Sequence, residues 1–128
     1  MPGGGPPPIM PMPGGGPPPH THSREAESFF VIEGEITFRV DGQTTVAPAG
    51  AFAHMPTGSL HSFRNETNQT ARMLITLIPA GLEEMFIEVG QLLPEGATSA
   101  SPPSPEDIAR LLAAAPRYGV EIQAPPPS

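Results

Sequence analysis

Short hydrophobic runs, each ended by turn-forming residues, make up the chain between residues 27 and 78. In the run 36–40, apolar and polar residues alternate strictly, so its three apolar side chains share one buried face of a strand. The Asp41-Gly42 pair that follows is typical of a two-residue hairpin turn. Because such runs recur at short spacing with no helices between them, the pattern predicts an antiparallel sandwich or barrel. The expected strands are residues 27–32, 36–40, 43–47, 51–55, 60–64 and 72–78.

After Pro79 the hydrophobic spacing changes to three and four residues, which predicts an amphipathic helix. Its apolar positions are Leu82, Met85, Phe86, Val89 and Leu92/Leu93. A second helix is expected from Pro105 to about residue 115, because Ser104 is a good N-cap and the first turn is acidic. The apolar stripe of this helix is narrow, so we expect it to dock on the sheet or on a partner subunit.

Proline divides the chain into regions. Nine of the 20 prolines precede residue 20 and eight follow residue 91, whereas only three lie between. The N-terminal region contains Pro-Gly-Gly-Gly-Pro-Pro-Pro twice, at 2–8 and 13–19, which is typical of a flexible lead-in or of a ligand for a proline-binding module. The expected regions are a Pro/Gly-rich lead-in (1–19), a globular part with the first helix (20–93), a linker (94–104), and a C-terminal helix with a Pro-rich tail (105–128).

Composition and charge exclude several classes of function. The net charge is −7 with six arginines and no lysine, which argues against nucleic-acid binding. The absence of cysteine excludes disulfides, thiolate catalysis and cysteine-held metals, so any metal must be bound by histidines and carboxylates. No apolar run is long enough to span a membrane and no export signal is recognisable, so we expect a cytoplasmic protein.

Three of the four histidines form a candidate metal site. His20 and His22 are two residues apart, so on an extended chain both imidazoles project from one face. Glu27 begins the next strand, and His61 lies within a later strand. Three imidazoles and one carboxylate suit a divalent transition-metal ion and leave coordination positions for solvent or substrate. The alternative is that these residues are hydrogen-bonded structural groups in a metal-free barrel.

The spacing of these residues resembles that of the cupin superfamily. Its first motif is matched by Gly14, His20, His22, Glu27 and Gly34, and its second by Gly50, Pro56, Gly58, His61 and Asn65. The resemblance covers about residues 13 to 80, and the chain is most similar to small single-domain cupins of the quercetin 2,3-dioxygenase-like type.

The resemblance implies an all-β fold, an antiparallel cupin jelly-roll β-barrel with C-terminal helices. It implies one divalent transition-metal ion, which is iron, manganese, nickel, cobalt, copper or zinc, held by His20, His22, Glu27 and His61. Glu27 would also be the catalytic base. The implied activity is a metal-dependent dioxygenase that acts on a small organic substrate. The alternatives are a metal-dependent isomerase or decarboxylase, or a cupin that binds a small molecule or metal without catalysis.

The chain departs from such cupins at its N-terminus, where only twelve residues precede the second Pro/Gly block. We expect the strands usual in this region to be absent, which would leave a sheet edge uncovered and favours a homodimer. A shortened chain with impaired packing is the alternative. We also expect Phe29, Phe38, Phe52 and Phe63 to be core residues, with a substrate-binding wall as the alternative for one or two of them. We expect His54 to lie on the surface or rim, with the pocket lining as the alternative, and Arg24 and Arg64 to be solvated or to orient an anionic substrate.

Overall fold

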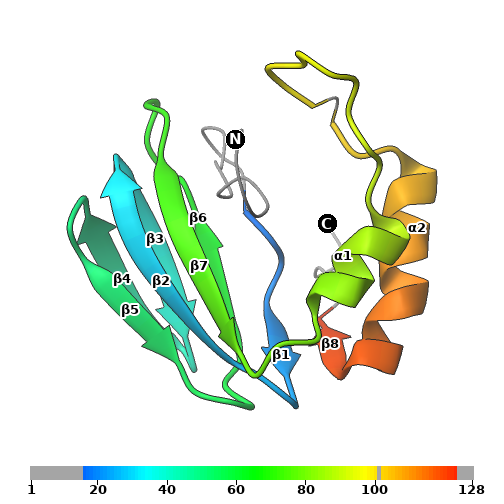
Figure 1. The fold of residues 1–128 in the computed structure, drawn as a ribbon. Helices are drawn as coiled ribbons and strands as arrows, with labels where there is room; N and C mark the ends of the chain where they lie inside the picture. The colour runs from blue at the N-terminus through cyan, green and yellow to red at the C-terminus, as the bar shows by residue number, and fades with distance from the viewer. Residues whose placement is uncertain (1–15, 101, 124–128) are drawn as a thin grey trace.

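The computed structural model describes residues 16–100 and 102–123 as two antiparallel sheets that face each other, with two α-helices at the side of the sheets, next to the edge strand β8 (Val120–Ile122) (Figure 1). The strands are β1 (His20–His22), β2 (Ala26–Glu33), β3 (Glu35–Val40), β4 (Gln43–Pro48), β5 (Phe52–Met55), β6 (His61–Arg64), β7 (Arg72–Ile78) and β8 (Val120–Ile122). The helices are α1 (Glu83–Val89), α2 (Pro105–Ala114) and the short 3₁₀ helix η1 (Ala115–Tyr118).

The strand order is β4-β3-β6-β1-β8 in the larger sheet and β5-β2-β7 in the smaller one. All six strands expected from the sequence are present. The Asp41-Gly42 hairpin turn between β3 and β4 is also confirmed, since both residues have the positive φ angles that such a turn requires (47° and 87°). The antiparallel jelly-roll barrel with C-terminal helices is therefore the observed fold.

The space between the sheets is filled by interlocking aromatic rings. The ring of Phe29 on β2 lies 5.1 Å from that of Phe38 on β3 and 5.3 Å from that of Phe63 on β6, measured between centroids. Such tilted and edge-to-face contacts add to the stability gained from burial. This barrel core consists of Phe29, Val31, Ile36, Phe38, Ala47, Met55, Phe63, Ala71 and Met73.

A second hydrophobic cluster lies between the helices and β8. This C-terminal core consists of Leu82, Met85, Ala114, Ala115 and Val120. The 3₁₀ helix η1 ends in a tight turn at Gly119, whose φ of 75° lies in the left-handed region that favours glycine. The turn reverses the chain into β8, which pairs with β1 along all three of its residues.

The strand β8 covers a sheet edge that we expected to be open. The sequence pattern did not predict this strand, and its pairing covers the edge of β1 that does not contact β6. β1 itself begins at His20 because residues 17–19 are prolines, which lack the N–H group needed for sheet pairing. The first Pro/Gly block, Gly14 and the C-terminal prolines lie outside the described residues.

Two further expectations were wrong. The first helix ends at Val89 and does not reach Leu92 and Leu93, because Gly90 adopts an extended conformation and the Leu92 side chain is fully exposed, with nothing to pack against. Phe52 is not a core residue: it lies on the outer face of β5 and is 67% exposed.

The second helix was correctly predicted. Ser104 caps it, and its side chain accepts a hydrogen bond from the Asp107 backbone while the Asp107 carboxylate accepts one from the Ser104 backbone. This reciprocal capping box satisfies two of the free N–H groups at the helix start. No helix in the described part of the chain is long and apolar enough to cross a membrane.

Candidate metal centre

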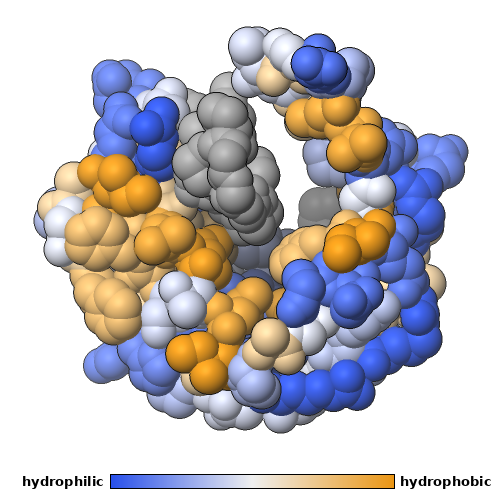
Figure 2. All heavy atoms as spheres, viewed as in Figure 1, coloured by the Kyte–Doolittle hydropathy of each residue, from blue (hydrophilic) through white to orange (hydrophobic). Residues whose placement is uncertain are grey.

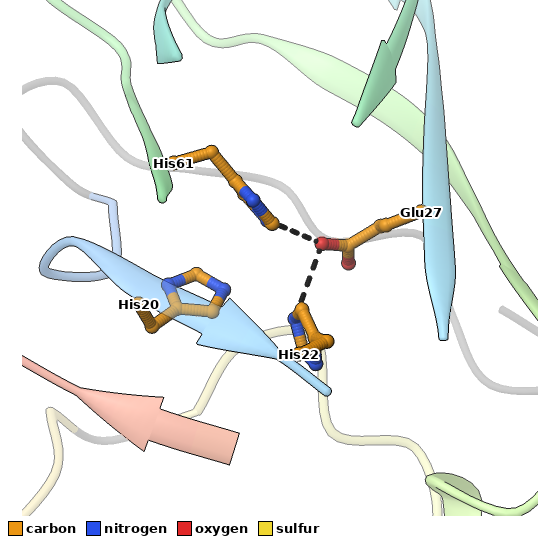
Figure 3. A group of neighbouring side chains, drawn as sticks. All are labelled: His20, His22, Glu27 and His61. Carbon is orange, nitrogen blue, oxygen red and sulfur yellow. Dashed lines mark hydrogen bonds and ion pairs between the residues drawn. The ribbon is translucent and has the colours of Figure 1, made fainter. Parts of the chain in front are cut away.

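Four side chains from three strands converge between the two sheets (Figure 3). His20 and His22 come from β1, His61 comes from β6, and Glu27 comes from β2 in the opposite sheet. Each offers one nitrogen or oxygen atom, and these four atoms lie within 4.8 Å of one another. We call these four residues the His/Glu cluster.

Strand pairing explains why these residues meet. His20 and His61 are direct partners in the register between β1 and β6, so their rings are neighbours, with centroids 4.6 Å apart. The alternation along β1 then brings His22 to the same face, while Thr21 lines a hollow of about 360 Å³ that also borders β8 and η1. Both imidazoles of the His-Thr-His sequence therefore point into the barrel, as expected.

Glu27 is the centre of the cluster. Its Oε1 atom accepts a hydrogen bond of 2.8 Å from His61 Nε2 and lies 3.4 Å from His22 Nε2 (Figure 3). Burial alone would raise the pKa of Glu27, but the neighbouring His22 and His61 imidazoles outweigh it and lower the pKa to about 2. The carboxylate is therefore ionised at neutral pH.

His20 is the most exposed member of the cluster, whereas the other three residues are buried. Its pKa is lowered, chiefly because burial disfavours the charged form and also because His61 and His22 lie close. A hydrogen bond from its Nδ1 to the Pro18 carbonyl acts in the opposite direction. A neutral imidazole is the form that binds a metal ion.

The donor set fits a divalent transition-metal ion. Three imidazole nitrogens and one ionised carboxylate converge from different directions, which is a typical arrangement for such ions. Both nitrogens of His22 are buried and make no hydrogen bond among the described residues. A buried ring nitrogen without a partner is costly, and a bound ion would satisfy the one that faces Glu27.

Other residues singled out from the sequence lie away from the cluster. His54 is exposed on the outer face of β5, where its Nδ1 atom lies 2.9 Å from Ser28 Oγ, so it is a surface residue. Arg24 and Arg64 are exposed as well. Asn65 is fully buried and shapes a turn, since its side chain contacts both Thr67 and the Gln69 carbonyl.

Sequence reasoning missed one buried residue, Glu25. Its side chain is only 4% exposed, and its Oε1 lies 3.8 Å from His22 Nδ1, on the side of that ring away from Glu27. The available signal was its position: Glu25 and Glu27 are two residues apart, so an extended chain directs both carboxylates to one face.

Comparison with solved structures agrees with the barrel seen here. A predicted oxalate decarboxylase from Thermotoga maritima matches with a TM-score of 0.52 and 28% identity, over 54% of this chain and 60% of that one. A recombinant oxalate oxidase in complex with glycolate matches with a TM-score of 0.50 and 29% identity, over 53% of this chain and 38% of that one.

Comparison with curated sequences gives a related result. The quercetin 2,3-dioxygenase of Bacillus subtilis (strain 168) is 34% identical over 71 residues, which is 56% of this chain and 21% of the relative. The chain thus spans about a fifth of the length of that relative. The sequence pattern of the cupin domain matches residues 9–77, more than half of the chain and all four members of the His/Glu cluster. The chain therefore belongs to the cupin family.

Proposed function

We propose that the protein is a metal-dependent dioxygenase that binds one divalent ion at the His/Glu cluster and oxidises a small organic substrate with dioxygen. The observation that carries the proposal is the convergence of four ligand atoms, one from an ionised carboxylate, within 4.8 Å inside a cupin barrel. The similarity to a quercetin 2,3-dioxygenase favours oxygenation over the other reactions found on this fold.

His20, His22, Glu27 and His61 would hold the ion. A bound ion supplies a Lewis acid and, when it is redox-active, an electron path between substrate and dioxygen. Glu27 has a second role in the proposal: its ionised carboxylate accepts the proton of a substrate hydroxyl and holds it inside the barrel. Buried walls formed by the barrel core exclude water from this proton and from the reacting atoms.

The first experiment measures the metal content of the purified protein by elemental mass spectrometry. We expect about one transition-metal ion per chain and nearly complete loss in His61→Ala, because that change removes a buried ligand. His54→Ala is the matched control, since it removes an exposed histidine and should keep the metal. Stoichiometric metal in His61→Ala would show that the ligand assignment is wrong.

Oxygen uptake then tests the reaction itself. With a flavonol substrate and a redox-active ion, the wild type should consume dioxygen, and Glu27→Gln should bind the substrate but turn it over slowly. A metal-dependent isomerase or decarboxylase is the second candidate function, which the similarity to a predicted oxalate decarboxylase favours. Product formation that continues without dioxygen, or with zinc as the bound ion, would indicate this second function. Tight binding without turnover would indicate a cupin that only binds its ligand.

A homodimer is part of the proposal. The outer face of the three-stranded sheet is mostly apolar, with one ion pair between Arg72 and Glu33, and Figure 2 shows apolar side chains gathered over it. An interface between two identical copies brings the same surface together, so a chain of net charge −7 can associate there without bringing unpaired acidic groups into contact. The exposed large apolar residues on this face are Phe30, Ile32, Phe52, Leu74 and Ile78.

Light scattering tests the dimer. The wild type should have twice the mass of the chain, and Phe52→Glu should be monomeric because it puts like charges opposite each other at the interface. Val46→Glu, a change of an exposed residue on β4 in the other sheet, is the control that should stay dimeric. A monomeric wild type would exclude this interface.

A further inference from the structure

The three imidazoles of the His/Glu cluster differ in what they contact on the side away from Glu27. His20 Nδ1 donates a hydrogen bond of 2.9 Å to the Pro18 carbonyl, and His61 Nδ1 donates one of 3.2 Å to the Ser59 carbonyl. A carbonyl oxygen only accepts, so both rings carry a hydrogen on Nδ1, and His61 also donates from Nε2 to Glu27 in the metal-free protein. Nε2 is then the atom that each ring offers to an ion, after loss of any proton shared with Glu27.

His22 has no such backbone acceptor among the described residues. Neither of its nitrogens makes a hydrogen bond, and both are buried. Its Nε2 faces Glu27 at 3.4 Å, as the metal site requires, while its Nδ1 faces the Oε1 atom of Glu25 at 3.8 Å.

Glu25 is equally unusual. It is buried, and its Oε1 makes no hydrogen bond within the described chain. Burying a carboxylate and a ring nitrogen without hydrogen-bond partners is unfavourable for both groups. The ring nitrogen can donate the hydrogen bond that the carboxylate lacks, and the carboxylate can accept it. A hydrogen bond from His22 Nδ1 to Glu25 would therefore match the Nδ1 hydrogen bonds of His20 and His61, with a carboxylate as the acceptor in place of a backbone carbonyl.

We propose that Glu25 is a positioning residue, whose carboxylate accepts the His22 Nδ1 hydrogen and thereby directs Nε2 into the His/Glu cluster. Shortening the present 3.8 Å separation to a hydrogen bond of about 3 Å requires a side-chain shift of less than about 1 Å. A carboxylate on the far nitrogen fixes the tautomer and the orientation of a metal-binding imidazole, and makes it a stronger ligand. The effect on metal affinity rests on the proposed function, but the effect on the tautomer does not.

The tautomer is tested in the metal-free protein by long-range ¹H–¹⁵N correlation spectra of the histidine rings. In the wild type His22 should carry a hydrogen on Nδ1, and Glu25→Ala should move that hydrogen to Nε2, where the Glu27 Oε1 atom at 3.4 Å is the remaining acceptor. Glu25→Gln should preserve the Nδ1 form, because an amide oxygen still accepts a hydrogen bond. The spectra of His20 and His61 serve as internal controls, since their backbone acceptors are unchanged.

Metal affinity is tested by competition for Zn²⁺ with a chromophoric chelator. We expect Glu25→Ala to weaken binding by about 10- to 100-fold and Glu25→Gln to weaken it less. Glu35→Ala, which removes an equal charge from an exposed position on β3, should bind as the wild type does. A purely structural role for Glu25 predicts instead that stability falls while the affinity of the folded fraction stays the same.

The outcomes separate this inference from the proposed function. If the wild type binds no metal, the proposed function fails and the tautomer spectra alone decide the role of Glu25. If the wild type binds Zn²⁺ and Glu25→Ala binds it equally well, the inference is wrong while the metal site stands. Should Glu25→Ala fail to fold, the same measurements on Glu25→Gln decide, because loss of the Nδ1 form in that variant would also overturn the proposal.

Discussion

The barrel core and the C-terminal core are built differently. The barrel core contains three interlocking phenylalanines, whereas the C-terminal core is made of small and aliphatic side chains, two of them alanines. The His/Glu cluster depends on both. Glu27 and His61 lie on the strands that carry Phe29 and Phe63. β1, which carries the other two histidines, instead pairs with β6 only at His20 and with β8 along its whole length.

The comparison indicates that the metal centre lies across a junction between two packing units. The barrel core positions the carboxylate and one imidazole by large, rigid side chains. The other two imidazoles are held in place by β8, which the C-terminal core supports through Val120, the register partner of His22. A change in the barrel core should therefore affect the positions of Glu27 and His61, whereas a change in the C-terminal core should affect those of His20 and His22.

The largest effect is expected from Phe38→Ala. It removes a ring that contacts both Phe29 and Phe63, so the free energy of unfolding should fall by about 3–5 kcal/mol. Urea denaturation followed by circular dichroism measures this loss. Phe52→Ala, a matched change of an exposed phenylalanine, should cost far less, and similar losses for both variants would contradict the assignment of the core.

Leu82→Ala should have the next largest effect, because it opens a cavity in the C-terminal core. We expect a loss of about 2–3 kcal/mol. Amide hydrogen exchange should accelerate in β8 and β1 more than in β2 and β7, and metal affinity should fall. Ile87→Ala, at an exposed position of α1, is the control. Equal acceleration in all strands would mean that the two cores unfold as one unit.

Ser104→Ala should have a smaller effect, a loss of about 1 kcal/mol, because it removes the side-chain half of the capping box at the start of α2. Thermal unfolding measures it. Because α2 supplies Ala114 to the C-terminal core, any effect on metal binding should be weaker than that of Leu82→Ala. A loss of metal as large as in Leu82→Ala would show that the capping box acts on the site directly.

The smallest effect concerns pH. Hydrogen bonds from the backbone and side chain of Ser104, together with Arg110, lower the pKa of Asp107 below its usual 3.8. Since the pKa is lower in the folded state, the stabilisation is present above pH 3.8 and disappears as the pH falls through the folded-state pKa. Asp107→Asn should therefore be less stable than the wild type at pH 7, and this difference should shrink at pH 3. Denaturation at both pH values measures it, and an unchanged difference would contradict the capping role.

The motif residues were predictable because their chemistry depends on local spacing. Alternation along a strand places His20 and His22 on one face whatever the rest of the chain does. Glu25 was not predicted, because its spacing from Glu27 indicates only a shared face, and nothing local distinguishes a buried acid beside an imidazole from a solvated one. Phe52 was assigned to the core for the same reason: a hydrophobic residue in a strand does not by itself show which face is covered.

The sequence by itself determined six of the eight strands, the second helix with its cap, and the four residues of the His/Glu cluster. These features depend on periodicity, turn chemistry and short spacings within the chain. Only the tertiary structure decided that β8 covers β1, that the first helix ends at Val89, and that Glu25 faces His22. Each of these depends on contacts between segments distant in sequence, or on whether a surface exists for a side chain to pack against, and a one-dimensional pattern records neither.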